Sequence, residues 1–166
     1  MKISRIVAAT AVALALVLGA AGPSYAAGSE TLVMQIKTKS GKMLANETAA
    51  MPADYAGPQT ITCYVDDVTP PFRIFYNVAY RSIIGCDAPV VAAHYGEGLV
   101  RRNGPEEYKT MGDLAGPLTT WTPFNPVVGP CIEDWWIAAF VIRVDFTPHE
   151  SLSKFFFPPE AYITCL

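Results

Sequence analysis

Few side chains in this sequence could act together in nucleophilic catalysis. Histidine occurs only at His94 and His149, so these two imidazoles are the candidate general bases. No serine stands in the G-x-S-x-G pattern that exposes a nucleophile on a sharp turn. The sequence therefore names no catalytic residue, and the question of an enzyme stays open with the balance against it.

Carboxylates occur in three adjacent pairs, at positions 66–67, 106–107 and 133–134. Neighbouring residues of a strand point to opposite faces of a sheet, so an adjacent pair does not form the facing pair that glycoside hydrolysis requires. The chain also has no C-x-x-C zinc pattern, no Walker sequence and no G-x-G-x-x-G fingerprint. We therefore expect neither a metal site nor a cofactor.

The first 26 residues have the pattern of a bacterial export signal. Lys2 and Arg5 precede an apolar run over residues 6–18, and Ser24-Tyr25-Ala26 forms a small-x-small cleavage site. The run is shorter than the roughly 20 residues that span a bilayer, so we expect a secreted, extracellular protein without a membrane span. Removal of the leader would leave 10 basic against 15 acidic residues. That acidic balance argues against a nucleic-acid partner.

Four cysteines, Cys63, Cys86, Cys131 and Cys165, lie in the part that would be exported. An even number of cysteines in such a chain predicts disulfides, and four cysteines allow three pairings. We favour Cys63–Cys86 with Cys131–Cys165, because these pairs close the shortest loops, with 22 and 33 residues between partners. Each such disulfide would stabilise the fold by roughly 3.5–4 kcal/mol.

Aromatic side chains provide the candidate binding surface. Trp135 and Trp136 are adjacent on a predicted strand, so one should face the core and the other the outside. Trp121 and Phe124 stand in a proline-rich segment, whose stiff backbone would present them at low entropic cost, unless the segment folds back as a lid. An outward tryptophan can stack on a sugar ring or anchor a protein partner. We take these four residues as the candidate binding surface.

Alternating apolar residues predict strands along most of the exported chain. The expected segments are 32–37, 59–65, 72–81, 90–102, 105–111, 132–146 and 162–165. Asn103-Gly104 between the fourth and fifth segments favours a two-residue type I′ hairpin. Because no amphipathic helix accompanies these strands, we predict an all-β fold. We expect an antiparallel β-sandwich or barrel-like sandwich of 6–8 strands, stapled by two disulfides.

A single β domain is expected over residues 27–166, after the signal peptide of residues 1–26. Its N-terminal part, residues 27–58, is rich in Ala, Pro and Gly after the first strand, so we expect it to be loosely ordered. Residues 112–130 carry four prolines and are expected to form a long loop, of a kind that is often functional.

The order of these features resembles a known group of proteins. Cys63 and Cys86, the Asn103-Gly104 hairpin, Cys131 followed by Trp135-Trp136, and the terminal Cys165 are similar to small secreted actinobacterial proteins with two disulfides and a β-sandwich. The resemblance covers residues 63–165. It implies an exported bacterial protein of uncharacterised function, and it transfers no catalytic or binding residue.

Three functions are compatible with these observations. The favoured one is an extracellular binding module that contacts a protein or a cell-surface polysaccharide through the 112–130 loop and the outward tryptophan. The second is an inhibitor of a hydrolase, with residues 127–130 before Cys131 as an exposed, disulfide-braced loop. The third is a small secreted hydrolase. Catalytic residue types are scarce and unclustered, which places the binding module first.

Overall fold

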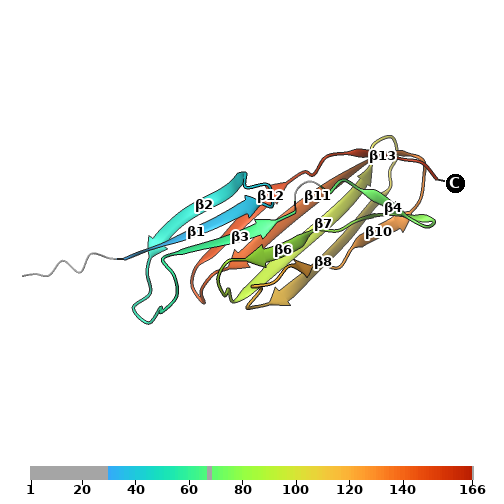
Figure 1. Cartoon of the computed structure of the whole chain (residues 1–166). Coiled ribbons are helices and arrows are strands. Elements are labelled where there is room, and N and C mark those ends of the chain that lie inside the picture. Colours follow the sequence, from blue (N-terminus) through green and yellow to red (C-terminus); the bar gives the residue numbers. More distant parts are fainter. Residues whose placement is uncertain (1–29, 67–68, 166) are drawn as a thin grey trace, which may run out of the picture. The chain divides into compact units, whose positions relative to one another are not determined.

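The computed structural model describes residues 30–66 and 69–165. Within these residues the chain forms thirteen strands in three sheets and has no helix (Figure 1). The all-β class is therefore confirmed, and the strands exceed the expected 6–8 because several have only two to four residues. The expected signal peptide, residues 1–26, lies outside the described residues.

The sheets are defined by their hydrogen-bonded neighbours. Sheet A has the order β2 (Met43–Ala50), β1 (Thr31–Thr38), β3 (Thr60–Val65), β6 (Ile83–Cys86) and β9 (Thr122–Pro123). Sheet B has the order β10 (Val127–Pro130), β5 (Asn77–Tyr80) and β4 (Phe72–Ile74). Sheet C has the order β12 (Ser151–Phe156), β11 (Asp134–Asp145), β7 (Ala92–Arg101) and β8 (Glu107–Ala115), and β13 (Ala161–Ile163) also pairs with β11. The sheets are antiparallel except for the β1–β3 pair, which is parallel.

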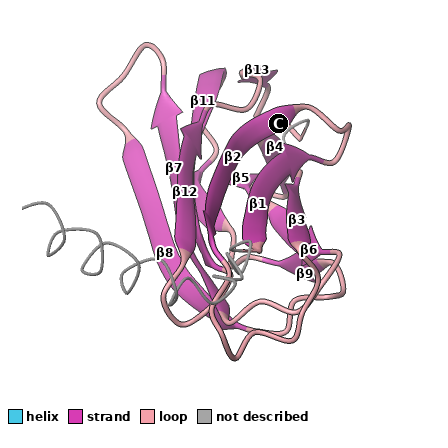
Figure 2. Cartoon of the chain, turned by 90° about the vertical axis from the view of Figure 1, so that its left-hand side faces the viewer, coloured by secondary structure: helices cyan, strands magenta, loops and turns pink. Residues whose placement is uncertain are grey.

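Sheet C faces sheet A across the core, as the view in Figure 2 shows. Sheets A and B follow one another along the chain, because only Arg81 and Ser82 separate β5 from β6. Along β11 the side chains alternate as the sequence predicts, with Trp136, Phe140 and Ile142 buried and Trp135 and Arg143 outward. Buried residues of β1, β3 and β7 complete the same core. The core of the sandwich is thus formed by every second side chain along each of these strands.

Both disulfides have the favoured pairing. Cys63 and Cys86 are direct cross-strand partners in β3 and β6, with their Cα atoms 4.0 Å apart, and both are buried. Cys131 and Cys165 join the segment after β10 to the residues after β13, with a Cα–Cα distance of 5.8 Å. The first disulfide therefore lies inside a sheet, whereas the second ties together the segments at one end of the fold.

The expectation of a loosely ordered segment over residues 27–58 is wrong for residues 31–50. β1 and β2 form an antiparallel hairpin there, whose turn contains Gly41 in the left-handed region (φ 94°). The amide of Lys42 donates to Thr38 Oγ1 at 2.9 Å and fixes the turn. Cross-strand pairing with β1 thus overrides the low strand propensity of the alanines in β2.

The single strand expected over residues 72–81 is two strands. Phe72 pairs with Ala79 and Ile74 with Asn77, so the chain reverses at Phe75 and Tyr76. Sequence alternation concealed the reversal, because neither turn residue is Gly, Asn, Asp or Pro. The result is a tight hairpin with an aromatic tip.

The long proline-rich loop expected over residues 112–130 is shorter than predicted. β8 continues to Ala115, and β9 and β10 add edge strands to sheets A and B. Prolines are tolerated at such edges because their missing N–H groups need no partner there.

The Asn103-Gly104 hairpin is also present, but its loop is longer than two residues. The amide of Arg101 bonds the Glu106 carbonyl at 3.0 Å, and Asn103 Nδ2 donates to Asp134 Oδ1 at 2.6 Å. The asparagine thus anchors the loop to β11 instead of forming a type I′ turn.

Candidate binding surface

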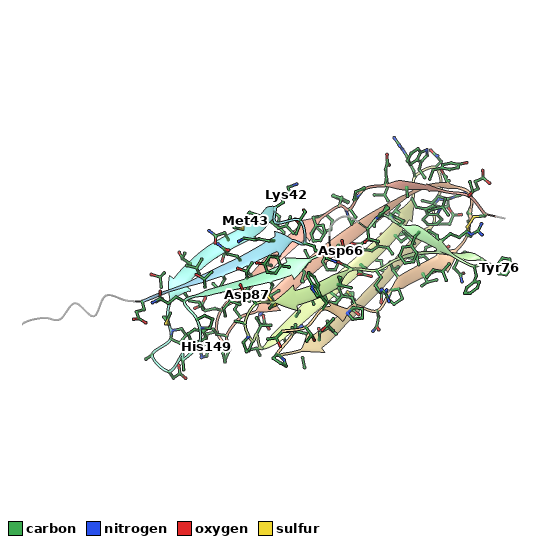
Figure 3. All side chains as sticks on the ribbon, in the orientation of Figure 1. Lys42, Met43, Asp66, Tyr76, Asp87 and His149 are labelled. Atoms are coloured by element: carbon green, nitrogen blue, oxygen red, sulfur yellow. A yellow bond between two sulfur atoms is a disulfide. The ribbon has the colours of Figure 1, made fainter. Side chains whose placement is uncertain are left out.

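The most exposed aromatic residues of the described chain lie at the tip of the β4–β5 hairpin. Phe75 is 84% exposed and Tyr76 is 81% exposed, and the neighbouring Ile74 is exposed as well. Figure 3 shows Tyr76 projecting from the end of the hairpin. We call Phe75 and Tyr76 the aromatic tip. Two large aromatic side chains left in water by an ordered turn point to a role outside the core.

Phe75 adopts a backbone conformation that disfavours its own side chain. Its φ is 53°, in the left-handed region that glycine occupies without steric cost. Two-residue hairpin turns of the primed types need such an angle at the first central position, where type I′ favours asparagine or glycine and type II′ favours glycine. For a residue with a Cβ, the conformation costs about 1–2 kcal/mol. The chain therefore keeps phenylalanine at this position at the expense of stability.

The hairpin is fixed to the disulfide end of the fold by two hydrogen bonds. The amide of Cys131 donates to the Tyr76 carbonyl at 2.9 Å. Arg73 Nη1 donates to the carbonyl of Thr164 at 3.2 Å, next to Cys165. Both partners of the Cys131–Cys165 disulfide thus lie beside contacts to the hairpin. This bracing holds the aromatic tip in one orientation, which lowers the entropy lost on binding.

The four aromatic residues proposed from the sequence have separate places in the structure. Trp136 is buried in the core, and its Nε1 donates to the Ile132 carbonyl at 2.9 Å. Trp135 faces outward, 40% exposed, and makes an edge-to-face contact with Tyr162. Phe124 is buried, so its assignment to the binding surface is wrong. It packs on Tyr95 and Phe140, with ring centroids 4.2 and 5.4 Å away, because the segment before β10 folds over the core.

Trp121 remains a surface residue, 47% exposed, in the segment that leads into β9. Its ring lies against Gly85 of β6, where an added Cβ would come within 3.2 Å of Trp121 Cδ2. On the ring, Lys39 Nζ stands 5.2 Å from the centroid. Trp121 also lines a shallow hollow of about 230 Å³ beside the Cys63–Cys86 disulfide.

His94 is held between two carboxylates on the outer face of sheet C. Its Nδ1 lies 2.6 Å from Asp113 Oδ1 and its Nε2 lies 2.9 Å from Asp145 Oδ2. Arg143 Nε donates to the other oxygen of Asp145 at 2.8 Å. The hydrogen bond to Asp113, followed by the one to Asp145, raises the pKa of His94. Two carboxylate partners favour the imidazolium form, which donates from both nitrogens and has no lone pair to act as a base.

Glu97 is a buried acid that the sequence analysis did not single out. It occupies an inward position of β7, between Tyr95 and Leu99, and its Oε1 accepts a hydrogen bond from the Ser82 amide at 2.7 Å. Burial raises the pKa of Glu97 to about 8, although hydrogen bonds from the Ser82 and Val127 backbone oppose this shift. Its inward place in the alternation of β7 was the available signal. Glu97 joins sheet C to the junction of sheets A and B, which is a structural role.

The inhibitor loop expected at residues 127–130 is not an exposed loop. These residues form β10, which pairs with β5, and Val127 and Gly129 are buried.

The sequence pattern did not predict the aromatic tip, because neither Phe75 nor Tyr76 is a glycine or asparagine that would mark a turn. One signal was present, since Phe75 breaks the polar face formed by Arg73 and Asn77.

No helix in the described residues has the length and hydropathy to cross a bilayer. Among the same residues, no cluster of three or more His, Cys, Asp or Glu side chains is arranged to hold a metal ion.

The resemblance to small secreted actinobacterial proteins stays a prediction. No protein family, curated protein or solved structure matches the chain.

Proposed function

We propose that the chain is an extracellular binding module that contacts a protein partner through the aromatic tip, Phe75 and Tyr76. The observation that carries this proposal is the exposure of both side chains, 84% and 81%, on a turn whose geometry favours glycine at Phe75. A position chosen for stability alone would hold glycine or asparagine. Strain of this kind is typical of residues kept for function.

The shape of the aromatic tip suits a protein partner whose surface has a pocket for these two side chains. Aromatic side chains that enter a pocket of the partner contribute most of the binding energy in many interfaces. Ile74 of β4 and Val128 of β10 are also exposed, on the two strands that flank β5 in sheet B. The bond from the Cys131 amide to the Tyr76 carbonyl keeps this surface rigid before binding.

The state of His94 supports a binding role over catalysis by this residue. Both ring nitrogens are engaged with Asp113 and Asp145, so the imidazole does not stand beside a serine nucleophile. A hydrolase inhibitor remains a special case of the proposal. In that case the partner is a hydrolase and the aromatic tip, in place of residues 127–130, enters its cleft.

The test is a capture experiment with matched variants. The oxidised protein, immobilised, is exposed to culture supernatant and to sheared envelope from the source cells, and retained material is identified by mass spectrometry. We expect saturable capture of a protein, reduced at least tenfold in a Phe75→Gly/Tyr76→Ser variant. Phe75→Gly suits the turn, so lost capture is not explained by lost folding.

Met111→Ala is the control, because Met111 is 83% exposed but lies on β8 of sheet C. Capture should survive this change. Equal capture by the tip variant and the wild-type protein would refute the proposal, as would an empty eluate from folded wild-type protein. Retention of a polysaccharide in place of a protein would also contradict it. Stoichiometric inhibition of a captured hydrolase would identify the inhibitor case.

A further inference from the structure

We propose that the hollow between Tyr64 and Trp121, on the outer face of sheet A, binds a neutral pyranose ring. This site is separate from the aromatic tip, and its ligand would be a carbohydrate. The hollow has a volume of about 230 Å³. The residues that line it are Tyr64, Gly85, Cys86, Asp87, Thr119 and Trp121.

The floor of the hollow depends on a missing side chain. Gly85 is the direct cross-strand partner of Tyr64, so a bare stretch of β6 backbone lies beside the tyrosine. A Cβ at Gly85 would stand 3.2 Å from Trp121 Cδ2 and 3.4 Å from Cε3. The glycine therefore allows the indole to lie against the strand, where it forms an aromatic wall of the hollow that Tyr64 also lines.

The backbone holds the position of Trp121. The next residue, Thr122, pairs with Ile84 in the β9–β6 ladder, and its Oγ1 donates to the Thr120 carbonyl at 3.0 Å. The indole is 47% exposed although its backbone is fixed on both sides. An aromatic ring that is fixed before binding loses little entropy when a ligand stacks on it.

Asp87 supplies a positioned acceptor at the rim. Its Oδ1 accepts a hydrogen bond from the Thr62 amide at 2.8 Å, and its own amide donates to the Thr62 carbonyl at 3.0 Å. This pair of bonds orients the carboxylate next to the aromatic walls. Thr119, whose side chain carries a hydroxyl group, lines the same hollow. A few polar groups around an apolar surface are what fixes the orientation of a small ligand.

The charges around the ring decide the ligand class. Lys39 Nζ stands 5.2 Å from the Trp121 centroid, so a cationic ligand on this ring would meet a like charge. Asp87 lines the hollow and would repel an anionic ligand. A wholly apolar ligand would desolvate the carboxylate without a hydrogen bond.

A neutral sugar ring meets all three constraints. Its C–H face can stack on Trp121, and its hydroxyls can bond to Asp87 and Thr119. The exposed contact between Lys39 and the indole is worth only about 0.5–1 kcal/mol, so a ligand can displace it. The ammonium group is then free to donate to a ring hydroxyl.

The experiment is a titration with three neutral hexasaccharides, built of β-1,4-linked glucose, β-1,4-linked N-acetylglucosamine and α-1,4-linked glucose. The indole N–H signal of Trp121 is followed by NMR in the oxidised protein. We expect at least one of the three sugars, at millimolar concentration, to shift this signal in a saturable way. Affinities of the variants are measured by isothermal titration calorimetry with the sugar that shifts the signal, because Trp121→Ala has no indole to follow. Trp121→Ala should abolish binding, and Asp87→Asn should weaken it about tenfold through the lost charge-assisted bonds.

Gly85→Ala is the second variant, because its added Cβ forces the indole to shift by a few tenths of an ångström without removing any core side chain. It should weaken binding while the protein stays folded. Trp135→Ala is the matched control, since Trp135 is 40% exposed but lies on sheet C, and it should bind normally. The Phe75→Gly/Tyr76→Ser variant should also bind normally, so failure of this site and failure of the aromatic tip are distinguishable. No shift with any of the three sugars, or unchanged affinity in Trp121→Ala, would overturn the proposal.

Discussion

The backbone amide of Cys131 donates a hydrogen bond of 2.9 Å to the carbonyl of Tyr76. This bond connects a disulfide cysteine to the turn of the β4–β5 hairpin, and the Cys131–Cys165 disulfide continues the connection to the end of the chain after β13. The covalent link thus positions an exposed aromatic turn as well as stabilising the fold.

Phe75→Gly should stabilise the protein. The substitution relieves the cost of a left-handed φ of 53°, and the phenyl ring that it removes is 84% exposed. We expect a gain of about 1 kcal/mol, which would raise the thermal midpoint by about 3–5 °C. Thermal denaturation followed by circular dichroism measures the shift. Tyr76→Gly is the control and should not stabilise, because Tyr76 does not have a positive φ. A lower midpoint for Phe75→Gly would show that the phenyl ring stabilises the turn.

The two disulfides should differ in their reaction with a reductant. Cys63 and Cys86 are buried, whereas Cys131 and Cys165 are partly exposed. Limited reduction followed by alkylation and mass spectrometry should therefore label Cys131 and Cys165 first. Full reduction should lower the thermal midpoint by more than about 10 °C, since each disulfide closes a loop worth roughly 3.5–4 kcal/mol. Simultaneous labelling of all four cysteines, or an unchanged midpoint, would count against this assignment.

Glu97 should make the protein less stable as the pH rises. Its pKa is raised from 4.5 to about 8 in the fold, so the folded state holds a proton that the unfolded chain releases. The resulting stability is fully present below pH 4.5 and is lost as the pH rises through 8. Glu97→Gln keeps the size of the side chain and its acceptor for the Ser82 amide, and it cannot ionise. The variant should lose less stability than the wild type between pH 6 and pH 9 in urea denaturation. Glu107→Gln, at an exposed position of β8, should behave as the wild type does.

His94 should titrate above its usual value of 6.5, because Asp113 and Asp145 favour its charged form. The raised pKa contributes stability that is present below pH 6.5 and is lost as the pH rises through the folded value. NMR titration of the His94 ring protons measures this pKa directly. Asp113→Asn removes the larger contribution and should lower the pKa, whereas Asp54→Asn, outside this cluster, should leave it unchanged. A His94 titration at or below 6.5 in the wild type would contradict the prediction.

Local sequence patterns were sufficient for the features that depend on near neighbours. The alternation over residues 132–146 predicts that Trp135 and Trp136 face opposite sides, and in β11 Trp136 is buried and Trp135 is exposed. The shortest-loop rule selects Cys63–Cys86 and Cys131–Cys165, and both pairs are present. The same rules failed where a turn lacked its usual residues. Phe75 and Tyr76 continue a strand pattern in the sequence although the chain reverses there.

The sequence by itself predicted the all-β class and the alternation of side chains between the two faces of regular strands, and it favoured the disulfide pairing that the structure shows, because these properties depend on period and spacing. Only the tertiary structure decided that Phe124 is buried against Tyr95, and that Tyr64, Gly85 and Trp121 form one hollow. The reason is strand order. Residues of β3, of β6 and of the segment before β9 meet only because those strands are neighbours in sheet A. Strand order is set by packing of the whole core, which no local pattern records.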